Sequence, residues 1–211
     1  MAFIAQPTST CSGFDCTALG PVRVLLRDLA TGALINLESQ VRFTTAQGVA
    51  DGGAWLSPNG RTLAFSSRAD YPQAGDTNSK SDMFALDIAS GNVQLVSTDA
   101  AGQQLTVPGF AGSGPTWGVQ AFLSNSSKIA FYSDNTSAEP AGVYVKDLAT
   151  GALVNAATLT NGTVGNGKTT TNVLLSRDGR AAAFGSNSTN LLGGVSPLGG
   201  AELRAYRKLL P

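Results

Sequence analysis

The 211-residue sequence contains no histidine, and this absence excludes several kinds of site. Without an imidazole the chain has no Ser–His–Asp or Cys–His catalytic group and no zinc site with histidine ligands. Chemistry by carboxylates alone would need acidic pairs repeated toward the inner strands, and the sequence shows none. We therefore expect no catalytic residue and no enzyme activity in this chain.

The sequence also lacks an excess of charge and a long apolar run. Fourteen Lys and Arg residues balance fourteen Asp and Glu residues, so a nucleic-acid partner is not expected. No apolar run approaches the roughly 20 residues of a membrane span, and no basic and apolar leader marks a signal peptide. The 42% of hydrophobic residues and 25 glycines argue against a disordered chain and against a helical bundle.

Two short segments recur in alternation, which indicates a tandem array of similar units. The first has the pattern Asp-x-x-Thr/Ser-Gly and begins at Asp28, Asp87 and Asp147, which are 59 and 60 residues apart. The same spacing leads next to Arg207, in a strand-like stretch without the aspartate. The second segment passes from a serine through a turn into an apolar stretch that ends in phenylalanine. Its copies cover residues 55–65, 122–131 and 174–184.

Both segments have the composition of hairpins. The dipeptides Asn59-Gly60 and Asp178-Gly179 tolerate the positive φ angles of tight turns. In the other segment the aspartate can accept backbone N–H bonds and the glycine can adopt the left-handed conformation. Apolar runs of four to six residues flank both turns, so each unit is predicted to contain four antiparallel strands.

Four antiparallel strands per unit, repeated radially, are typical of a β-propeller blade. The pattern Ser-x-Asn/Asp-Gly-Arg…Ala-Phe-x-Ser, followed by Gly75-Asp76-Thr77-Asn78, Ser81-Asp82-Met83-Phe84, Asp87 and Gly91, resembles the TolB-like, WD40-like propeller repeat. The resemblance covers most of the chain and is closest over residues 54–98. It implies an exported bacterial protein, extracellular or periplasmic.

The fold class is therefore predicted to be all-β, a single propeller domain of residues 1–211 that forms an arc of about four blades. Because Phe3 matches the phenylalanine of the second strand, the chain is expected to begin inside a blade and to end inside another. Such an arc would be incomplete, or a fragment of a ring of about six to eight blades; the alternative is a closed ring of four ragged blades. The predicted blades are residues 1–39 (partial), 53–98, 119–158 and 172–211 (partial).

The function expected from this architecture is a non-catalytic binding or scaffold module that contacts a protein or a glycan through loops or the channel face. Exposed terminal blades would also allow self-association. The alternative is an accessory propeller domain of a larger hydrolase or peptidase, because TolB-like propellers also occur beside peptidase domains. The catalytic domain would then lie outside these residues.

Cys11 and Cys16 are the only cysteines, and they lie close together around Gly13. Their even number and short spacing predict a disulfide in an oxidising compartment, and the alternative is two free thiols. Trp117, in a glycine-rich loop, is a candidate for stacking on a ligand or for packing in the interior. Trp55 is expected to pack between blades, as are the repeated Phe65, Phe131 and Phe184.

Residues 76–82 place oxygen-bearing side chains at alternating positions, as a calcium loop does. Asp76, Asn78 and Asp82 would be the ligands of such a site. Against this, the segment has no glycine at the sharp turn and no terminal glutamate, and Lys80 lies in its middle. The favoured alternative is a turn in which Asp76 and Asn78 bind nearby backbone N–H groups, so no cofactor is expected.

The segment Gly162–Thr169 matches the spacing of a phosphate-binding loop, with Gly167, Lys168 and Thr169 at its end. A phosphate-binding loop needs a helix that begins directly after it, whereas a threonine-rich strand is predicted here. We therefore interpret the match as a coincidence of composition.

Overall fold

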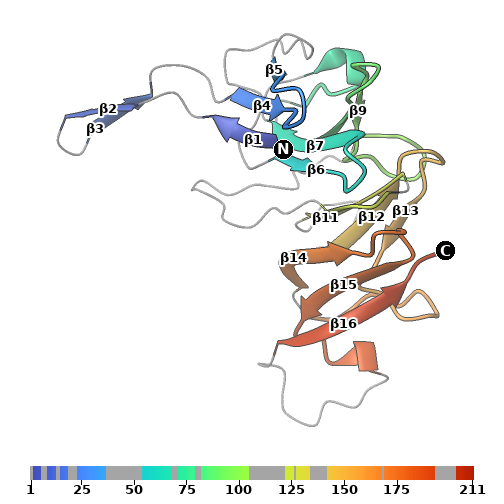
Figure 1. Ribbon diagram of the computed structural model, residues 1–211. Helices are drawn as coiled ribbons and strands as arrows, with labels where there is room; N and C mark the ends of the chain where they lie inside the picture. The colour runs from blue at the N-terminus through green and yellow to red at the C-terminus, as the bar shows by residue number, and fades with distance from the viewer. Residues whose placement is uncertain are drawn as a thin grey trace.

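The computed structural model describes residues 2–5, 9–12, 15–18, 23–36, 54–67, 71–78, 82–104, 122–125, 127–133, 142–167, 169–192 and 203–211. Within them the strands form four antiparallel sheets in succession and a separate two-stranded ribbon (Figure 1). Neither short 3₁₀ segment, Pro72–Ala74 or Asn190–Leu192, is long enough to cross a membrane, and no longer helix occurs in the described residues.

Each sheet is a meander whose strands lie in chain order. Sheet 1 contains β1 (Ala2–Ala5), β4 (Arg23–Arg27) and β5 (Leu34–Asn36). Sheet 2 contains β6 (Ala54–Leu56), β7 (Thr62–Ser67), β8 (Asp82–Asp87) and β9 (Val93–Leu95). Sheet 3 contains β10 (Phe122–Leu123), β11 (Lys128–Ser133), β12 (Gly142–Asp147) and β13 (Leu153–Asn155). Sheet 4 contains β14 (Thr169–Leu175), β15 (Ala181–Ser186) and β16 (Arg204–Leu209).

Sheets 2 and 3 are the four-stranded propeller blades that the repeat predicted, sheets 1 and 4 have three strands each in the described residues, and the four sheets form an open arc. Figure 1 shows sheet 1 and sheet 4 at opposite ends of the molecule. The ribbon consists of β2 (Ser9–Ser12) and β3 (Asp15–Ala18) and extends away from the sheets. The sequence predicted only a loop at this place. The ribbon is too short and too polar for its alternation of apolar residues to have revealed it.

The turn between the first and second strands of a blade is held by a serine side chain. In sheet 2 the Ser57 hydroxyl accepts a bond from the Thr62 amide (2.9 Å) and donates to Asn59 Oδ1 (2.7 Å). Ser176 makes the same two bonds in sheet 4, to the Ala181 amide and to Asp178 Oδ1, at the same distances. The following glycine has a φ of 71° in both turns. The predicted turn glycines are therefore confirmed, and the serine adds a side-chain bond that the sequence did not reveal.

The aspartate turns also form as predicted. Asp28 Oδ1 accepts from the Ala30 amide (2.8 Å), Asp87 Oδ1 from the Ser90 amide (2.8 Å), and Asp147 Oδ1 from the Ala149 amide (2.9 Å). These bonds hold the pKa of all three carboxyl groups below the ordinary value. Burial of Asp147 by itself would raise its pKa, but the hydrogen bonds from the Ser127 hydroxyl and the Ala149 amide lower the pKa by more.

Adjacent sheets pack through faces of different character. One face of each sheet carries aromatic rings that stack across two strands, as Phe65 does on Phe84 (centroids 5.5 Å apart) and Phe131 on Tyr144 (6.2 Å). The opposite face carries smaller residues, among them Ala64 and Ala130, and it receives the aromatic face of the next sheet. The predicted inter-blade role of Phe131 and Phe184 is confirmed, and Trp55 packs against the cluster between sheets 2 and 3. Phe65 is fully buried in a cluster made of residues of sheet 2 and its connections.

The strand register shows that Arg207 was matched to the wrong position of the repeat. Phe184 is paired with Tyr206, as Phe65 is with Phe84 and Phe131 with Tyr144. The residues three positions after Phe84, Tyr144 and Tyr206 are Asp87, Asp147 and Leu209. Leu209, and not Arg207, therefore occupies the position of the repeated aspartate. The constant spacing of about sixty residues misled the sequence alignment because the connection before β16 differs in length from the others.

Candidate functional site

The structure brings together the three residues predicted as a calcium loop. Asp76 and Asp82 are almost completely buried, with 0% and 1% of their surface exposed. The amide nitrogen of Gln104 donates to both carboxylates, at 2.8 Å to Asp76 Oδ1 and 3.2 Å to Asp82 Oδ2. The side chain of Asn78 contributes a further hydrogen bond to Asp82. The buried group is thus a pair of carboxylates bridged by one amide.

Burial raises the pKa of Asp82 to about 6. The neighbouring Asp76 carboxylate acts in the same direction, while the hydrogen bonds from Ser97, Asn78 and Gln104 oppose it. Ser97 Oγ donates to Asp82 Oδ1 over 2.5 Å and accepts from the Met83 amide at 3.2 Å. These bonds tie the beginning of β8 to the residues just after β9.

This carboxylate pair is better suited to fixing the connection between β7 and β8 than to holding a cation. The second oxygen of Asp76 accepts from the Tyr71 amide (3.0 Å), which is the backbone bond that the turn interpretation predicted. The Gln104 amide nitrogen lies between the carboxylates, at the position where a cation would bind both. Within the residues described, no group of three or more His, Cys, Asp or Glu side chains gathers. Calcium binding by Asp76, Asn78 and Asp82 remains a prediction.

The other predicted site residues lie away from this carboxylate pair or outside the described residues. Trp117 lies outside the described residues. Cys11 and Cys16 face each other in the register of the ribbon, directly opposite across β2 and β3. This backbone placement is what a disulfide needs, and the disulfide itself remains a prediction. Residues 162–167 form part of the connection from β13 to β14, where a strand follows, so the helix of a phosphate-binding loop is absent here.

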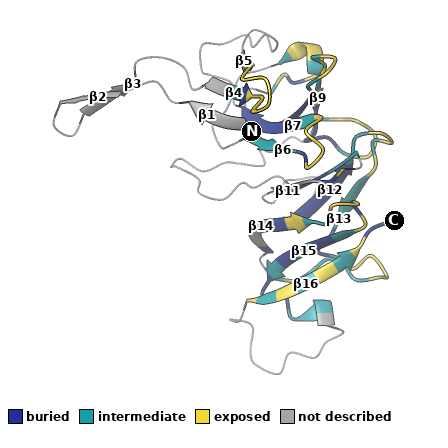
Figure 2. Ribbon diagram, in the orientation of Figure 1, coloured by how far each residue is buried: buried dark blue, intermediate teal, exposed yellow. Residues whose placement is uncertain are grey.

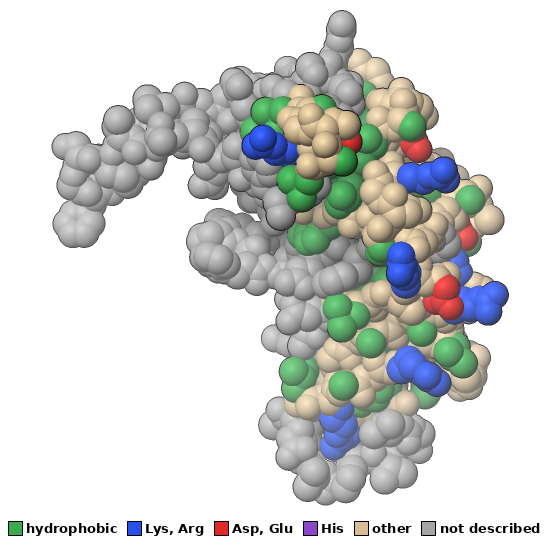
Figure 3. All heavy atoms as spheres, in the orientation of Figure 1, with side chains coloured by type: hydrophobic (Ala, Val, Ile, Leu, Met, Phe, Trp, Pro, Cys, Tyr) green, Lys and Arg blue, Asp and Glu red, His purple; other side chains and the backbone are tan. Residues whose placement is uncertain are grey.

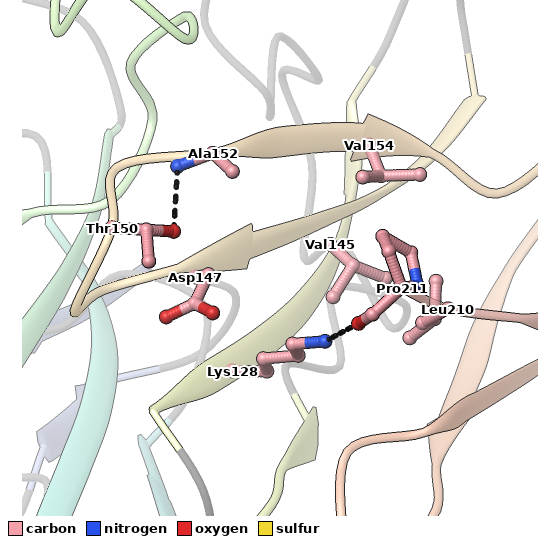
Figure 4. Close-up of a pocket in the computed structure, with 8 residues that line it drawn as sticks. All are labelled: Lys128, Val145, Asp147, Thr150, Ala152, Val154, Leu210 and Pro211. Atoms are coloured by element: carbon pink, nitrogen blue, oxygen red, sulfur yellow. Dashed lines mark hydrogen bonds between the residues drawn. The ribbon is translucent and has the colours of Figure 1, made fainter.

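Sequence reasoning missed a cavity of about 250 Å³ between sheets 3 and 4 (Figure 4). Two groups of residues line it on the side of sheet 3. They are Lys128, Val145 and Asp147 from β11 and β12, and Thr150, Ala152 and Val154 from the following turn and β13. Leu210 and Pro211, after β16, close the other side, and the Lys128 ammonium group donates to the Pro211 carbonyl oxygen. The walls are mainly aliphatic, and Figure 4 shows the Lys128 ammonium group directed toward Pro211.

The cavity lies beside an open strand edge. Sheets 2 and 3 each have a fourth strand, β9 and β13, whereas sheet 4 has three strands in the part of the chain that is described. In sheet 3 the Ala156 amide donates to the Val143 carbonyl (2.7 Å), and the Asp147 amide donates to the Ala152 carbonyl (2.9 Å). The register makes Ala205 and Leu209 the counterparts of Val143 and Asp147. Their outward backbone groups form the edge of sheet 4.

The face of sheet 4 that points away from sheet 3 is apolar and exposed. We call it the outer face and define it by Leu174, Ala183, Ala205, Arg207 and Leu209. Leu174 is 57% and Leu209 65% exposed. Figure 2 shows the contrast between the buried β7 and the exposed and intermediate residues of β16, and Figure 3 shows hydrophobic side chains at the surface over this end of the molecule.

Residues at the equivalent positions of sheets 2 and 3 are buried. Ala183 occupies the position of Ala64 and Ala130, both 0% exposed, and Arg207 that of Ala85 and Val145, both 3% exposed. Sequence reasoning predicted exposed terminal blades in general terms. It could not identify the outer face, because the side that each strand residue occupies follows from the register.

No protein-family profile and no curated protein matches the chain. Among solved structures, TolB from Acinetobacter baumannii is similar over 89% of this chain and 35% of that chain (16% identity, TM-score 0.48). A putative TolB from Agrobacterium tumefaciens is similar over 91% and 52% (15% identity, TM-score 0.46). A mutant puromycin hydrolase complexed with PGG is similar over 79% and 22% (16% identity, TM-score 0.36).

The chain thus spans 35% and 52% of the lengths of the two TolB chains. The class is a β-propeller array, as the repeated segments predicted. The strand order described above carries this assignment.

Proposed function

We propose that this chain is a non-catalytic module that binds another protein through the outer face of sheet 4. The single observation that carries the proposal is the exposure of Leu174 and Leu209 on a sheet face whose counterparts in sheets 2 and 3 are buried. A face of small and aliphatic residues around Arg207, without an aromatic residue, fits the side chains of a protein better than it fits a glycan, which needs aromatic platforms. By the TolB-like resemblance, the module belongs to an exported bacterial protein.

The alternative, an accessory domain of a hydrolase, also uses a protein-binding face, but directed at a catalytic domain of the same protein. The described residues contain no feature that favours this alternative. Both hypotheses share the prediction that the outer face is covered in the working protein.

The experiment is light scattering and sedimentation of the 211-residue chain over a range of concentrations. Without another partner, the outer face should be covered by a second copy, so the wild-type chain should associate as concentration rises. The double variant Leu174→Lys, Leu209→Lys should remain monomeric. The control is Leu29→Lys, Leu34→Lys, which changes two equally exposed leucines on sheet 1 and should associate like the wild type. A wild-type chain that stays monomeric and unfolds cooperatively at every concentration would overturn the proposal.

A further inference from the structure

Three asparagines directly precede a glycine, in the dipeptides Asn59-Gly60, Asn161-Gly162 and Asn166-Gly167. Glycine has no side chain that hinders its backbone nitrogen, so this nitrogen is able to attack the side-chain carbonyl carbon of the preceding asparagine. In a folded chain the reaction requires that the asparagine side chain is free to turn toward the glycine. The structure gives the three side chains very different restraints.

Asn59 and Asn161 lie at the same position of the same kind of turn. In both turns the amide of the following glycine donates to the carbonyl oxygen three residues back, at 2.8 and 3.0 Å. Gly60 and Gly162 both have a positive φ, 71° and 86°. Both asparagines are exposed. Because the backbone presents the two sites alike, a difference in their reactivity must come from the side chains.

Asn59 and Asn166 are held at both ends of their side-chain amides. Asn59 Oδ1 accepts from the Ser57 hydroxyl (2.7 Å) and the Arg61 amide (3.1 Å). Its nitrogen donates to a carbonyl oxygen in the equivalent turn of sheet 3 (3.3 Å). Asn166 Oδ1 accepts from the Thr189 amide, and the Asn166 side-chain nitrogen donates to the Thr189 hydroxyl, both at 2.9 Å. Either side chain turns toward its glycine only when several hydrogen bonds break.

Asn161 is held by a single side-chain hydrogen bond. Its Oδ1 accepts from the Thr163 amide (3.0 Å), and its nitrogen has no partner among the described residues. Asn161 and Gly162 are both exposed, so water reaches them. Ala101 occupies the same place in the matching turn after sheet 2, so the turn itself does not require an asparagine.

We propose that Asn161 is a site of spontaneous covalent modification in the folded chain, and that formation of isoaspartate there releases Lys208. The Gly162 nitrogen bonds to Cγ of Asn161, and its proton leaves with the side-chain nitrogen as ammonia. Water then adds to one of the two carbonyl carbons of the resulting five-membered imide. Opening on one side gives aspartate, and opening on the other gives isoaspartate, whose main chain is one methylene longer.

The reaction site lies beside the contact between Lys208 and the connection that follows sheet 3. The Lys208 ammonium group donates to the carbonyl oxygens of Thr158 (2.9 Å) and Leu159 (3.4 Å). The Leu159 carbonyl oxygen also accepts from the Gly162 amide (3.0 Å). Isoaspartate lengthens the main chain between Leu159 and Gly162, so the two carbonyl oxygens lose the positions that bind the ammonium. Aspartate keeps the length, and Asp178 holds the equivalent position in the turn of sheet 4.

The test is to age the folded 211-residue chain at mildly alkaline pH and to locate the modified asparagines by peptide mass spectrometry with site-resolved fragmentation. Asn161 should react at least about tenfold faster than Asn59, which must first give up two more side-chain hydrogen bonds. In the chain unfolded by urea, Asn59, Asn161 and Asn166 should react at similar rates, since a glycine follows each. Equal rates at Asn59 and Asn161 in the folded chain would overturn the inference.

Labelling of lysine amines with an acylating reagent measures the release of Lys208. The labelling rate of Lys208 should rise several-fold as isoaspartate accumulates during ageing. Lys146, which makes the same kind of contact one sheet earlier, is the internal control and should keep its rate. A Lys208 that stays as unreactive in the isoaspartate form as in the fresh chain would show that the modification does not reach the junction, and would refute the proposed release.

Two variants separate the lengthened main chain from the added charge. Asn161→Ala, which copies Ala101 of the matching turn, should show neither the modification at this position nor a change in Lys208 labelling on ageing. Asn161→Asp adds the carboxylate without the extra methylene, so its Lys208 should remain as protected as in the fresh wild-type chain. If ageing increases Lys208 labelling equally in Asn161→Ala, the release has another cause and the inference is wrong.

Discussion

The Lys208 ammonium group of sheet 4 donates to the carbonyl oxygen of Thr158, 2.9 Å away in the connection that follows sheet 3. Lys146 makes the same kind of contact one sheet earlier, with the carbonyl oxygens of Thr98 (3.2 Å) and Asp99 (2.6 Å). The register places both lysines at one repeat position. A charged hydrogen bond between successive sheets therefore recurs at two junctions and adds to the apolar packing.

Replacing Lys146 with methionine should destabilise the chain. The substitution keeps the length of the side chain and removes its bonds to two carbonyl oxygens, and Lys146 is buried. Hydrogen bonds to charged groups of this kind contribute about 1.5 to 3 kcal/mol, so the free energy of unfolding should fall by about 2 kcal/mol. Urea denaturation measures the change. Arg177→Met, at an exposed position, should change stability by less than about 0.5 kcal/mol, and equal losses for both variants would refute the role of Lys146.

The buried Asp82 should make the chain less stable as the pH rises from about 4 to about 6. Its pKa is about 6 in the folded chain and 3.8 as an ordinary aspartate, so the folded state holds an extra proton in this range. Ionisation above pH 6 then costs about 2 to 3 kcal/mol, and the cost vanishes below the ordinary value. Asp82→Asn should remove this contribution. Denaturation at a pH of about 4.5 and about 7.5 gives the difference directly.

Asp178→Asn is the matched control for that experiment, because Asp178 titrates with the opposite effect. The Ser176 hydroxyl and the Arg180 amide lower its pKa, so its stabilisation is present above the ordinary value and is lost as the pH falls. Asparagine is also the residue at the equivalent turn position, Asn59. If Asp82→Asn leaves the pH profile of the wild type intact, Asp82 is ionised in the folded chain without penalty.

Gly167 should be required for packing and not for phosphate binding. A Cβ atom at this position would lie 2.5 Å from Asn187 Oδ1 and 2.6 Å from the Ser188 backbone nitrogen. Gly167→Ala should therefore cost about 1 to 3 kcal/mol in the free energy of unfolding. Gly162 has a φ of 86° and open space around it, so Gly162→Ala should cost only about 1 kcal/mol. Nucleoside triphosphate should leave the melting temperature unchanged, and a clear rise would restore the phosphate-loop interpretation.

Cys11 and Cys16 should be joined when the chain is produced in an oxidising compartment. The evidence is their direct opposition in the ribbon. Alkylation followed by intact-mass measurement should show no modified cysteine before reduction and two after it. Because the ribbon forms no sheet with the other described strands, reduction should change the stability of the four sheets by less than about 0.5 kcal/mol. Two alkylated cysteines in the unreduced protein would contradict the prediction.

The repeated segments allowed the strands, the turns and the propeller class to be predicted, because glycine and aspartate at fixed turn positions act locally. The carboxylates of Asp76 and Asp82 could be named from the sequence because they lie in one short segment. Their partner Gln104 could not, because it follows β9 and no sequence pattern indicates that the fold brings it to this segment. Of the two junction lysines, Lys146 directly precedes a repeated aspartate, whereas Lys208 precedes Leu209, so the sequence pattern did not show that the two lysines share one repeat position. No sequence pattern indicates the cavity, because it lies beside Leu210 at the edge of sheet 4, and the sequence alone does not show how sheets 3 and 4 pack there.

The central claim is that sheet 4 is a propeller blade with an open third strand, and backbone hydrogen exchange tests it most directly. In sheets 2 and 3 the alternation of antiparallel bonds directs the amides of Ala85 and Val145 toward fourth strands. The Arg207 amide has the same position in sheet 4 and should exchange about a hundredfold faster than those two in the monomeric chain. Equal protection of all three amides in a monomer would show that the edge is covered and would contradict the account.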